Sequence, residues 1–270
     1  MATVISREFE LLHMCSSYGY KRKANGGAGV TSASTGYYYC ENHAIWDARC
    51  VPITGMVTGR TVIDFCKAPI ISHLLAMKDF VQEITILDMN SPGVKEIEKW
   101  KNKDPDAFDW SHVVGILKEL KGNRNEMEDE EEDLRGKLKN ILHLEHCKGI
   151  DSLLLPKADI TTSMWFLDVI SKDHDEYREN LRKLCNIIQL GGYLLICTSS
   201  NCSYFKVGEH IYHVLSSDES FFRKVISEEG FDIKHFETFD KVMSCDSADH
   251  EGMVFIIAHK VKEPQEASWT

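Results

Sequence analysis

The sequence has no apolar run long enough to span a bilayer, and its opening stretch, MATVISREFELLHMC, lacks the apolar core of a signal peptide. It also lacks any Cys-x-x-Cys pair. Its nine cysteines are odd in number and irregularly spaced, which favours reduced thiols in a cytoplasmic protein over a disulfide framework. Positive charge is scarce as well, since 31 Lys and Arg stand against 42 Asp and Glu. We therefore expect neither a nucleic-acid partner nor a membrane partner.

Glycine is missing from one turn where the surrounding pattern predicts it. Residues 61–77 read TVIDFCKAPIISHLLAM, in which a β-rich run ends in Asp64 and a turn leads into an amphipathic helix. This order is typical of a phosphate- or nucleoside-binding loop at the mouth of a parallel sheet. The turn itself is Phe-Cys-Lys-Ala-Pro. The pattern alone leaves three interpretations open: a working cofactor loop, a decayed one, or a simple connection between a strand and a helix.

Strand-like and helix-like segments alternate from residue 61 onward. Strands are predicted at 61–65, 83–88, 141–145, 158–166, 193–199, 232–240 and 252–260. Helices are predicted at 70–79, 93–101, 128–140, 175–188 and 218–229. This alternation predicts an α/β fold whose doubly wound, mostly parallel seven-stranded sheet is covered by helices on both faces. No helix separates the last two strands, so they are expected to form an antiparallel C-terminal hairpin at the edge of the sheet.

One domain is expected, with a segment added at each end. Residues 1–60 are interpreted as an N-terminal arm or cap, in which the small and polar stretch 18–36 is predicted to be flexible. Residues 61–262 form the domain and 263–270 a tail. The acidic run EMEDEEEDLRGKLKN predicts an exposed helix with carboxylates at its N-terminal end and lysines near its C-terminal end.

The residues at the strand ends are the candidates for a binding site. In a doubly wound sheet the ligand lies over the carboxyl ends of the strands, near the point where the strand order reverses. The polar or polarisable residues at these ends are Asp64, Asp88, Glu145, Ser163 and Met164. Asp88 ends the second strand and is placed to accept hydrogen bonds from both hydroxyls of a ribose. The alternative is that Asp88 caps the helix that follows it, which starts with Asn-Ser-Pro-Gly.

Several stretches resemble the nicotinamide N-methyltransferase family, which also contains phenylethanolamine and indolethylamine N-methyltransferases. They are EIEKWKNKDPDAFDWSHVV, GNRNEMEDEEEDLRGKLKNIL, LLLPKADITTSMWFLD, EYRENLRKLCNIIQLGGYLLIC, SYFKVGEHIY and HEGMVFIIAHK. The likeness runs in one register over residues 61–261, and the Glu-Lys-Trp…Ala-Phe-Asp-Trp core is specific to the family. The resemblance implies a class I methyltransferase (Rossmann-like) fold that uses S-adenosylmethionine to methylate the nitrogen of a small amine or pyridine.

Some cofactor positions match the family. The resemblance places Asp88 at the ribose-binding acid and Glu145-His146 at the family's Asp-Val pair, with the Glu145 carboxylate accepting from the adenine amino group. Ser163 matches the serine of the family's fourth-strand segment. Met164 stands in place of a threonine that flanks the cofactor, and its thioether packs without supplying a hydroxyl.

The first loop departs from the family, which has Asp-Ile-Gly-Ser-Gly-Pro where this chain has Asp64-Phe-Cys66-Lys67-Ala68-Pro. Glycine there lets the cofactor approach without a Cβ in the way. We expect the Cys66 side chain to project towards the methionine part of the ligand, and to add about 1–2 kcal/mol of strain if the position needs positive φ. Lys67 brings a cation either near the sulfonium or onto the ligand's carboxylate.

The acceptor side departs as well. Thr198 replaces an aspartate of the nicotinamide-type members, so this position offers a hydrogen bond but no charge for a cationic amine. Tyr204 and Phe205 keep the family's aromatic pair, though Phe205 lacks the hydroxyl. The tyrosine cluster that ends in Tyr39 is either the family's cofactor-closing helix or ordinary aromatic packing. Asp168 keeps the acid of the family's Leu-Asp pair and is interpreted as a loop anchor rather than a catalyst.

The sequence is compatible with two functions. One is an S-adenosylmethionine-dependent N-methyltransferase acting on a small amine or azaheterocycle. The other is a catalytically inactive pseudo-methyltransferase that serves as a binding or regulatory protein. Methyl transfer needs little acid–base help, so no catalytic residue is predicted. His143, His146 and Cys147 do not converge on one strand face, so no metal is predicted either. Relatives of this type are expected to act as monomers.

Overall fold

The computed structural model describes residues 56–66, 69–89, 91–121, 129–144, 150, 154–207, 210–240 and 248–264. The strands are β1 (Thr61–Cys66), β2 (Glu83–Asp88), β3 (Leu138–His143), β4 (Ala158–Met164), β5 (Ile188–Ser200), β6 (Tyr204–Val207), β7 (His210–His213), β8 (Phe231–Asp240) and β9 (Gly252–Lys260). The helices are α3 (Ser72–Met77), the 3-10 turn η2 (Lys78–Phe80), α4 (Ser91–Lys101), α5 (Ser111–Lys121), α6 (Glu130–Lys137), α7 (Leu167–Ile170), α8 (His174–Asn186) and α9 (Glu219–Glu228). No helix in these ranges is both long and apolar enough to cross a membrane.

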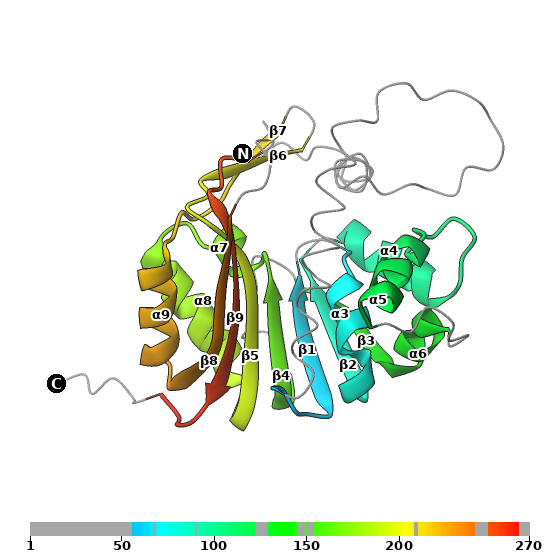
Figure 1. Cartoon of the computed structure of the whole chain (residues 1–270), viewed down its shortest axis with the longest axis horizontal. Helices are drawn as coiled ribbons and strands as arrows, with labels where there is room; N and C mark the ends of the chain where they lie inside the picture. The colour runs from blue at the N-terminus through cyan, green and yellow to red at the C-terminus, as the bar shows by residue number, and fades with distance from the viewer. Residues whose placement is uncertain are drawn as a thin grey trace.

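Seven strands form one sheet in the order β3-β2-β1-β4-β5-β9-β8. The first five pair in parallel, while β9 runs antiparallel to both β5 and β8. The predicted doubly wound sheet with an antiparallel C-terminal hairpin is therefore confirmed, and β8 forms its edge. The strand order reverses between β1 and β4. The separate hairpin β6–β7 lies beyond the end of the sheet to which the parallel strands point (Figure 1).

The two faces of the sheet carry two cores. Val62 and Cys66 of β1 belong to a core shared with α3, α4, α5 and α6. Ile63 and Phe65 face the other way, into a core shared with α8 and α9. This alternation follows from the pleat, which turns successive side chains of a strand to opposite faces. A residue near the carboxyl end of a strand is thus assigned to one face by its register alone.

The acidic run forms a helix, as predicted, but the helix is not simply exposed. Asp129 caps α6 by accepting a hydrogen bond from the Glu132 backbone N–H at 3.1 Å. The next residue, Glu130, is buried and pairs with the buried Lys78 at 2.9 Å. The expectation of an exposed helix is wrong for this side chain, because η2 supplies a cation directly beneath the first turn of α6.

Lys78 is the centre of a small ion-pair cluster. Its ammonium also lies 2.6 Å from Asp79 and 3.3 Å from Asp133. Burial by itself lowers the pKa of the Lys78 ammonium, but the hydrogen bonds and charges of Asp79 and Glu130 outweigh it and raise the pKa above its ordinary value. The cation therefore stays charged under all ordinary conditions and fixes α6 against η2.

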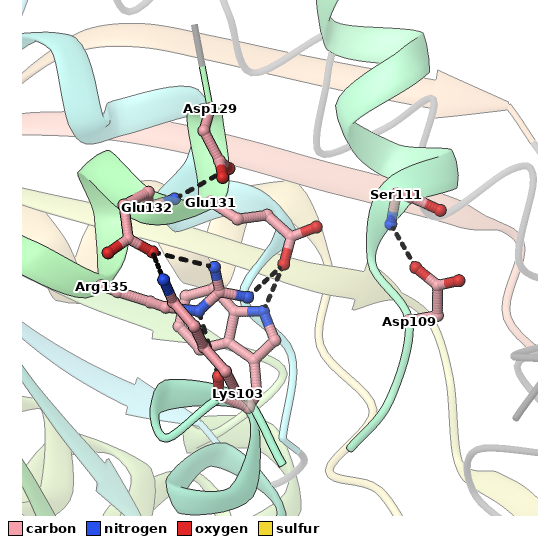
Figure 2. A network of polar contacts seen from close by, with 8 residues as sticks. Lys103, Asp109, Ser111, Asp129, Glu131, Glu132 and Arg135 are labelled. Atoms are coloured by element: carbon pink, nitrogen blue, oxygen red, sulfur yellow. Dashed lines mark hydrogen bonds and ion pairs between the residues drawn. The ribbon is translucent and has the colours of Figure 1, made fainter. Parts of the chain in front are cut away.

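A second polar network joins α4 to α6 (Figure 2). Glu131 accepts hydrogen bonds from the Trp100 indole N–H and from Arg135, each at 2.7 Å. The Arg135 guanidinium also lies 4.6 Å from the centre of the Trp100 ring and donates to the Trp100 carbonyl at 3.1 Å. At the exposed end of this network, Lys103 pairs with Glu132 at 2.7 Å. A buried indole that is both stacked and hydrogen-bonded holds the two helices in one orientation.

The connection between α4 and α5 is held by an aromatic pair. Phe108 and Trp110 are both buried, and their ring centres lie 4.8 Å apart in an edge-to-face arrangement. Glu96 of α4 accepts a hydrogen bond from the Phe108 backbone N–H at 2.9 Å. The stretch EIEKWKNKDPDAFDWSHVV therefore contributes to the core on the α4–α6 side of the sheet.

Three elements were not predicted from the sequence, namely α5, α7 and the hairpin β6–β7. In addition, the third strand was placed three residues too late, since β3 begins directly after α6 at Leu138. The acidic helix was accordingly predicted too long at its C-terminal end. The prediction rested on the apolar residues 141–142. Within the described part of the chain, β2 alone pairs with this strand. As an edge strand, it carries polar side chains and gives a weak signal.

Replacing Lys78 by methionine is expected to lower the free energy of unfolding by about 3 kcal/mol, because the buried Glu130 carboxylate is left without its cation. Urea denaturation at neutral pH measures this difference. Lys103→Met is the matched control, since the Lys103–Glu132 pair has side chains 61% and 52% exposed and is expected to contribute less than about 1 kcal/mol. Equal losses in the two variants would contradict a structural role for the Lys78 cluster.

Candidate active site

One row of paired residues crosses the carboxyl edge of the sheet on both sides of the strand-order reversal. The row consists of His143, Asp88, Cys66, Met164 and Cys197, on β3, β2, β1, β4 and β5. Three of the predicted cofactor residues, Asp88, Cys66 and Met164, are thus direct neighbours on adjacent strands. This edge is where a doubly wound sheet binds its ligand.

Asp64 lies one pleat below this row, fully buried. Its Oδ1 accepts hydrogen bonds from His73 Nε2 of α3 at 2.8 Å and from the Thr162 hydroxyl of β4. These contacts join β1, β4 and α3 at the point where the strand order reverses. The other oxygen, Oδ2, is buried and meets no hydrogen-bond donor among the residues that the structure describes. Oδ1 of Asp64 therefore stabilises the fold, and Oδ2 can still accept a hydrogen bond.

The backbone of Cys66 does not meet the condition for strain, and its side chain is buried. Cys66 is the last residue of β1, and its backbone is ordinary strand without positive φ. Its side chain is buried in the α3–α6 core, where Sγ–H donates to the Leu87 carbonyl at 3.9 Å. The strand continues past Asp64, so the pleat turns this thiol to the α3–α6 face of the sheet. No strain arises from its backbone, and contact of the thiol with the methionine part of the ligand stays a prediction.

Asp88 sits where β2 meets α4. Its buried carboxylate lies against Gly93, the third residue of the helix, and a Cβ at that glycine would be 2.2 Å from Oδ2. This close approach agrees with the interpretation that Asp88 supports the start of α4, whose N-terminal end attracts negative charge. The ribose-binding role stays a prediction. The two roles are compatible, since a carboxylate has two oxygens and four acceptor sites.

Ser163 and Thr198 face the other side of the sheet. Ser163 pairs with Phe65 and Ile196, and Thr198 pairs with Val254; all three partners belong to the α8–α9 core. The Ser163 and Thr198 hydroxyl oxygens are buried and have no hydrogen-bond partner within the described part of the chain. Buried hydroxyls are normally satisfied. These two hydroxyls thus have unused hydrogen-bonding capacity on the α8–α9 side of the sheet, opposite to the side on which Asp64 contacts α3.

Trp165 follows Met164 and is a site candidate that the sequence did not reveal. Its φ is +48°, and its backbone N–H donates to the Cys197 carbonyl at 2.9 Å. A bulky residue in this region costs about 1–3 kcal/mol and is retained where the surroundings over-determine it, often at functional sites. The indole is partly buried against the α3–α6 core. No composition or periodicity signals a strained tryptophan.

The hairpin β6–β7 places Phe205, rather than the predicted Tyr204, against the body of the protein. Phe205 stacks on Tyr212 of β7 with ring centres 5.0 Å apart and 14° between planes, and both rings pack against the α3–α6 core. Tyr204 lies on the opposite face of the hairpin, since it alternates with Phe205, and the Lys206 ammonium lies 5.4 Å from the centre of its ring. A role for Tyr204 in acceptor binding stays a prediction that this orientation does not favour.

Asp168 lies at the start of α7. Its carbonyl accepts the Leu215 backbone N–H at 2.8 Å, which fixes α7 against the segment before α9. Its side chain is buried near Tyr177 and Cys202. Burial raises the pKa of the Tyr177 phenol, and the Asp168 charge raises it further. These contacts support the interpretation of Asp168 as an anchor.

Four predicted site residues lie outside the described residues, namely Lys67, Glu145, His146 and Tyr39. His143 is described and is exposed, with Nε2 3.2 Å from the Met89 carbonyl oxygen. The cofactor loop itself is thus visible only at its two ends, Cys66 and Pro69. The predictions for the four residues stand as the sequence made them.

Sequence comparison decides the family. A family model described as the NNMT/PNMT/TEMT family matches residues 41–261. The chain belongs to this family. It is 32% identical to nicotinamide N-methyltransferase of Homo sapiens over 77% of this chain and 80% of that protein. It is 27% identical to indolethylamine N-methyltransferase of Oryctolagus cuniculus, over 76% and 79%, and 26% identical to phenylethanolamine N-methyltransferase of Macaca mulatta, over 80% of each.

Solved structures agree on the fold. A magnesium protoporphyrin IX methyltransferase from Synechocystis PCC 6803, with bound SAH, superimposes with a TM-score of 0.56 at 12% identity over 94% of each chain. A SAM-dependent methyltransferase from Methanosarcina mazei gives 0.53 at 14% identity, over 78% of this chain and 98% of the other. This member of the NNMT/PNMT/TEMT family is therefore a class I methyltransferase whose methyl donor is S-adenosylmethionine.

Because the Cys66 thiol points into the core, Cys66→Ala is expected to destabilise this methyltransferase by about 1–2 kcal/mol without improving cofactor affinity. Thermal unfolding and calorimetric titration with S-adenosylhomocysteine measure the two effects. Cys185→Ala is the matched control, since Cys185 is a fully buried thiol in the α8–α9 core. A large gain in affinity for Cys66→Ala alone would show that the thiol obstructs the ligand after all.

Proposed function

We propose that the acceptor is a small amine or pyridine-type molecule, methylated on nitrogen. The observation that carries this proposal is the aromatic composition of the acceptor half: the indole of Trp165, whose backbone φ is positive, and the stacked Phe205–Tyr212 pair, all packed on the α3–α6 side of the sheet. Aromatic walls suit a small flat or arylalkyl molecule. Thr198 faces the α8–α9 side, so a hydrogen bond from its hydroxyl to the acceptor stays a prediction.

Methyl transfer requires the protein mainly to position the donor and the acceptor. When bound, S-adenosylmethionine supplies an electrophilic methyl group, which passes to the acceptor nitrogen in an in-line displacement. The chain's task is to align the two reactants and exclude water, and a misplacement of about 1 Å costs on the order of a hundredfold in rate. Asp88 and the row beside it position the donor, while the aromatic residues position the acceptor. No side chain is required to act as an acid or base.

The alternative is a pseudo-methyltransferase. It is favoured by the substitution of Thr198 for the acid and of Met164 for the threonine of the family, and by the loop without glycine. The support from Cys66 is weakened, because its side chain is buried in the α3–α6 core and its backbone is unstrained. The match of the chain to the family over residues 41–261 supports an active enzyme.

Titration with S-adenosylhomocysteine, followed by transfer of a labelled methyl group to nicotinamide, tryptamine and phenylethanolamine, tests the proposal. We expect micromolar affinity and turnover of at least one acceptor. Asp88→Asn should weaken affinity by about tenfold or more if the carboxylate also binds the ligand. Asp173→Asn is the matched control, because Asp173 caps α8 with hydrogen bonds of 3.1 and 2.9 Å from Asp175 and Glu176. Absence of heat at millimolar ligand would favour the pseudo-methyltransferase, and heat without turnover would reject the acceptor class.

Trp165→Ala is expected to raise the KM for the acceptor by about tenfold while changing the affinity for S-adenosylhomocysteine less than about threefold, since the variant removes the ring but keeps the strand-end backbone. Steady-state kinetics and calorimetry give the two values. Trp100→Phe provides the comparison, because Trp100 is a buried tryptophan of the α4–α6 network and not of the site. A common loss of both affinities in Trp165→Ala would mean that the indole only supports the fold.

A further inference from the structure

The hairpin β6–β7 is attached to the body of the protein through the carboxylate of Asp249. Asp249 Oδ1 accepts the backbone N–H groups of Ser203 at 2.8 Å and of Tyr204 at 3.1 Å. Asp249 Oδ2 accepts the Ser203 hydroxyl. Asp249 lies three residues before β9, and Ser203 lies three residues after β5. One carboxylate therefore ties the first residues of the hairpin to the segment that leads into β9, the neighbour of the edge strand β8.

The pKa values of Asp249 and Cys202 reflect these contacts. Burial alone raises the pKa of the Asp249 carboxyl, but the donors of Ser203 and Tyr204 outweigh it and lower the pKa to about 2. Burial raises the pKa of the adjacent Cys202 thiol, and the Asp249 charge raises it further, to about 12. Cys202 thus stays a protonated thiol, and its Sγ–H donates to the Tyr204 carbonyl at 3.3 Å.

The attachment fixes the position of the aromatic pair. Phe205 follows directly after Tyr204, and a β-bridge joins it to Ala248, the neighbour of Asp249. Phe205 and its stacking partner Tyr212 then reach the α3–α6 core, against which Trp165 also packs. A short two-stranded ribbon has little stability of its own, so its orientation depends on these few contacts.

We propose that Asp249 is a positioning residue for the methyl acceptor: by holding Ser203 and Tyr204 it sets where Phe205 and Tyr212 close the acceptor half of the site. The inference rests on the proposed function for its kinetic consequence, but not for its structural one. Within the described residues, the hydrogen bonds of Asp249 that hold the hairpin come from Ser203 and Tyr204, whereas Asp88, Cys66 and Met164 lie on β2, β1 and β4. We therefore expect donor binding to be independent of Asp249.

Two substitutions separate this role from a general one. Asp249→Ala removes all three hydrogen bonds, whereas Asp249→Asn keeps Oδ1 for both backbone N–H groups and presents an amide to the Ser203 hydroxyl. Asp232→Ala is the matched control, because Asp232 is an exposed carboxylate at the start of β8 that pairs with Lys234 at 2.6 Å. We expect Asp249→Ala to raise the KM for tryptamine, or for whichever test acceptor turns over best, by about tenfold or more. The Kd of S-adenosylhomocysteine should stay within about threefold, and Asp249→Asn should restore most of the KM.

Alkylation of Cys202 tests the attachment without any turnover. Cys202 is 3% exposed, and Cys185 is fully buried in the opposite core. Asp249→Asn removes the same charge beside Cys202 as Asp249→Ala, so the two variants are compared with each other. With iodoacetamide and mass-spectrometric mapping, Asp249→Ala should label Cys202 at least about tenfold faster than Asp249→Asn while Cys185 labels at the same rate, since only a local opening is expected. Equal Cys202 labelling in the two variants would overturn the inference even in an active enzyme, as would an equal rise at both cysteines. A parent without turnover would overturn the proposed function alone, since the labelling still decides the attachment.

Discussion

The buried carboxylate of Asp64 is the contact on which the carboxyl edge of this methyltransferase depends. It stands at the reversal of strand order and receives hydrogen bonds from β4, through Thr162, and from α3, through His73. A buried charge is tolerated only when it is well paired, so these three elements are held in one arrangement. The loop that follows β1 therefore starts from a fixed point, and the neighbouring strands offer their end residues to the same ligand. Asp64 can serve the cofactor without direct contact, by fixing where the loop begins.

The family-specific Glu-Lys-Trp…Ala-Phe-Asp-Trp core packs on the α4–α6 side of the sheet. Trp100, Glu131 and Arg135 join α4 to α6, and Phe108 packs on Trp110 beside them. Interlocked aromatic and ionic contacts allow few substitutions, because each partner constrains the other. The departures at Cys66 and Met164, by contrast, lie at strand ends. Membership of the family consequently fixes the fold and the methyl donor more firmly than it fixes the methyl acceptor.

The sequence was sufficient for the sheet, because short apolar runs such as 83–88, which alternates, and 252–260, which is apolar over most of its length, are strong strand signals. No helix pattern separates the last two runs, which implied the antiparallel hairpin. The sequence was also sufficient to bring Asp88, Cys66 and Met164 to one edge, since parallel strands share their carboxyl ends. The sequence was not sufficient to predict to which face of the sheet the side chains at the strand ends point. Whether β1 ends at Asp64 or at Cys66 decides which way the thiol points, and a helix or strand boundary is uncertain by a residue or two. The positive φ of Trp165 left no trace in the sequence, because the residue type disfavours it.

The two halves of the site are built on different principles, and this difference explains why family members can diverge in their acceptors. The donor half is part of the sheet: Cys66 and Met164 lie in the core, so a change there disturbs the packing of the whole domain. The acceptor half depends on β6–β7, a ribbon joined to the domain by the polar contacts of Asp249 and the stacking of Phe205 on Tyr212. Side chains on such a ribbon can be exchanged at little cost to global stability, because few core contacts are lost. An enzyme built in this way keeps one methyl donor while its acceptor pocket is free to change.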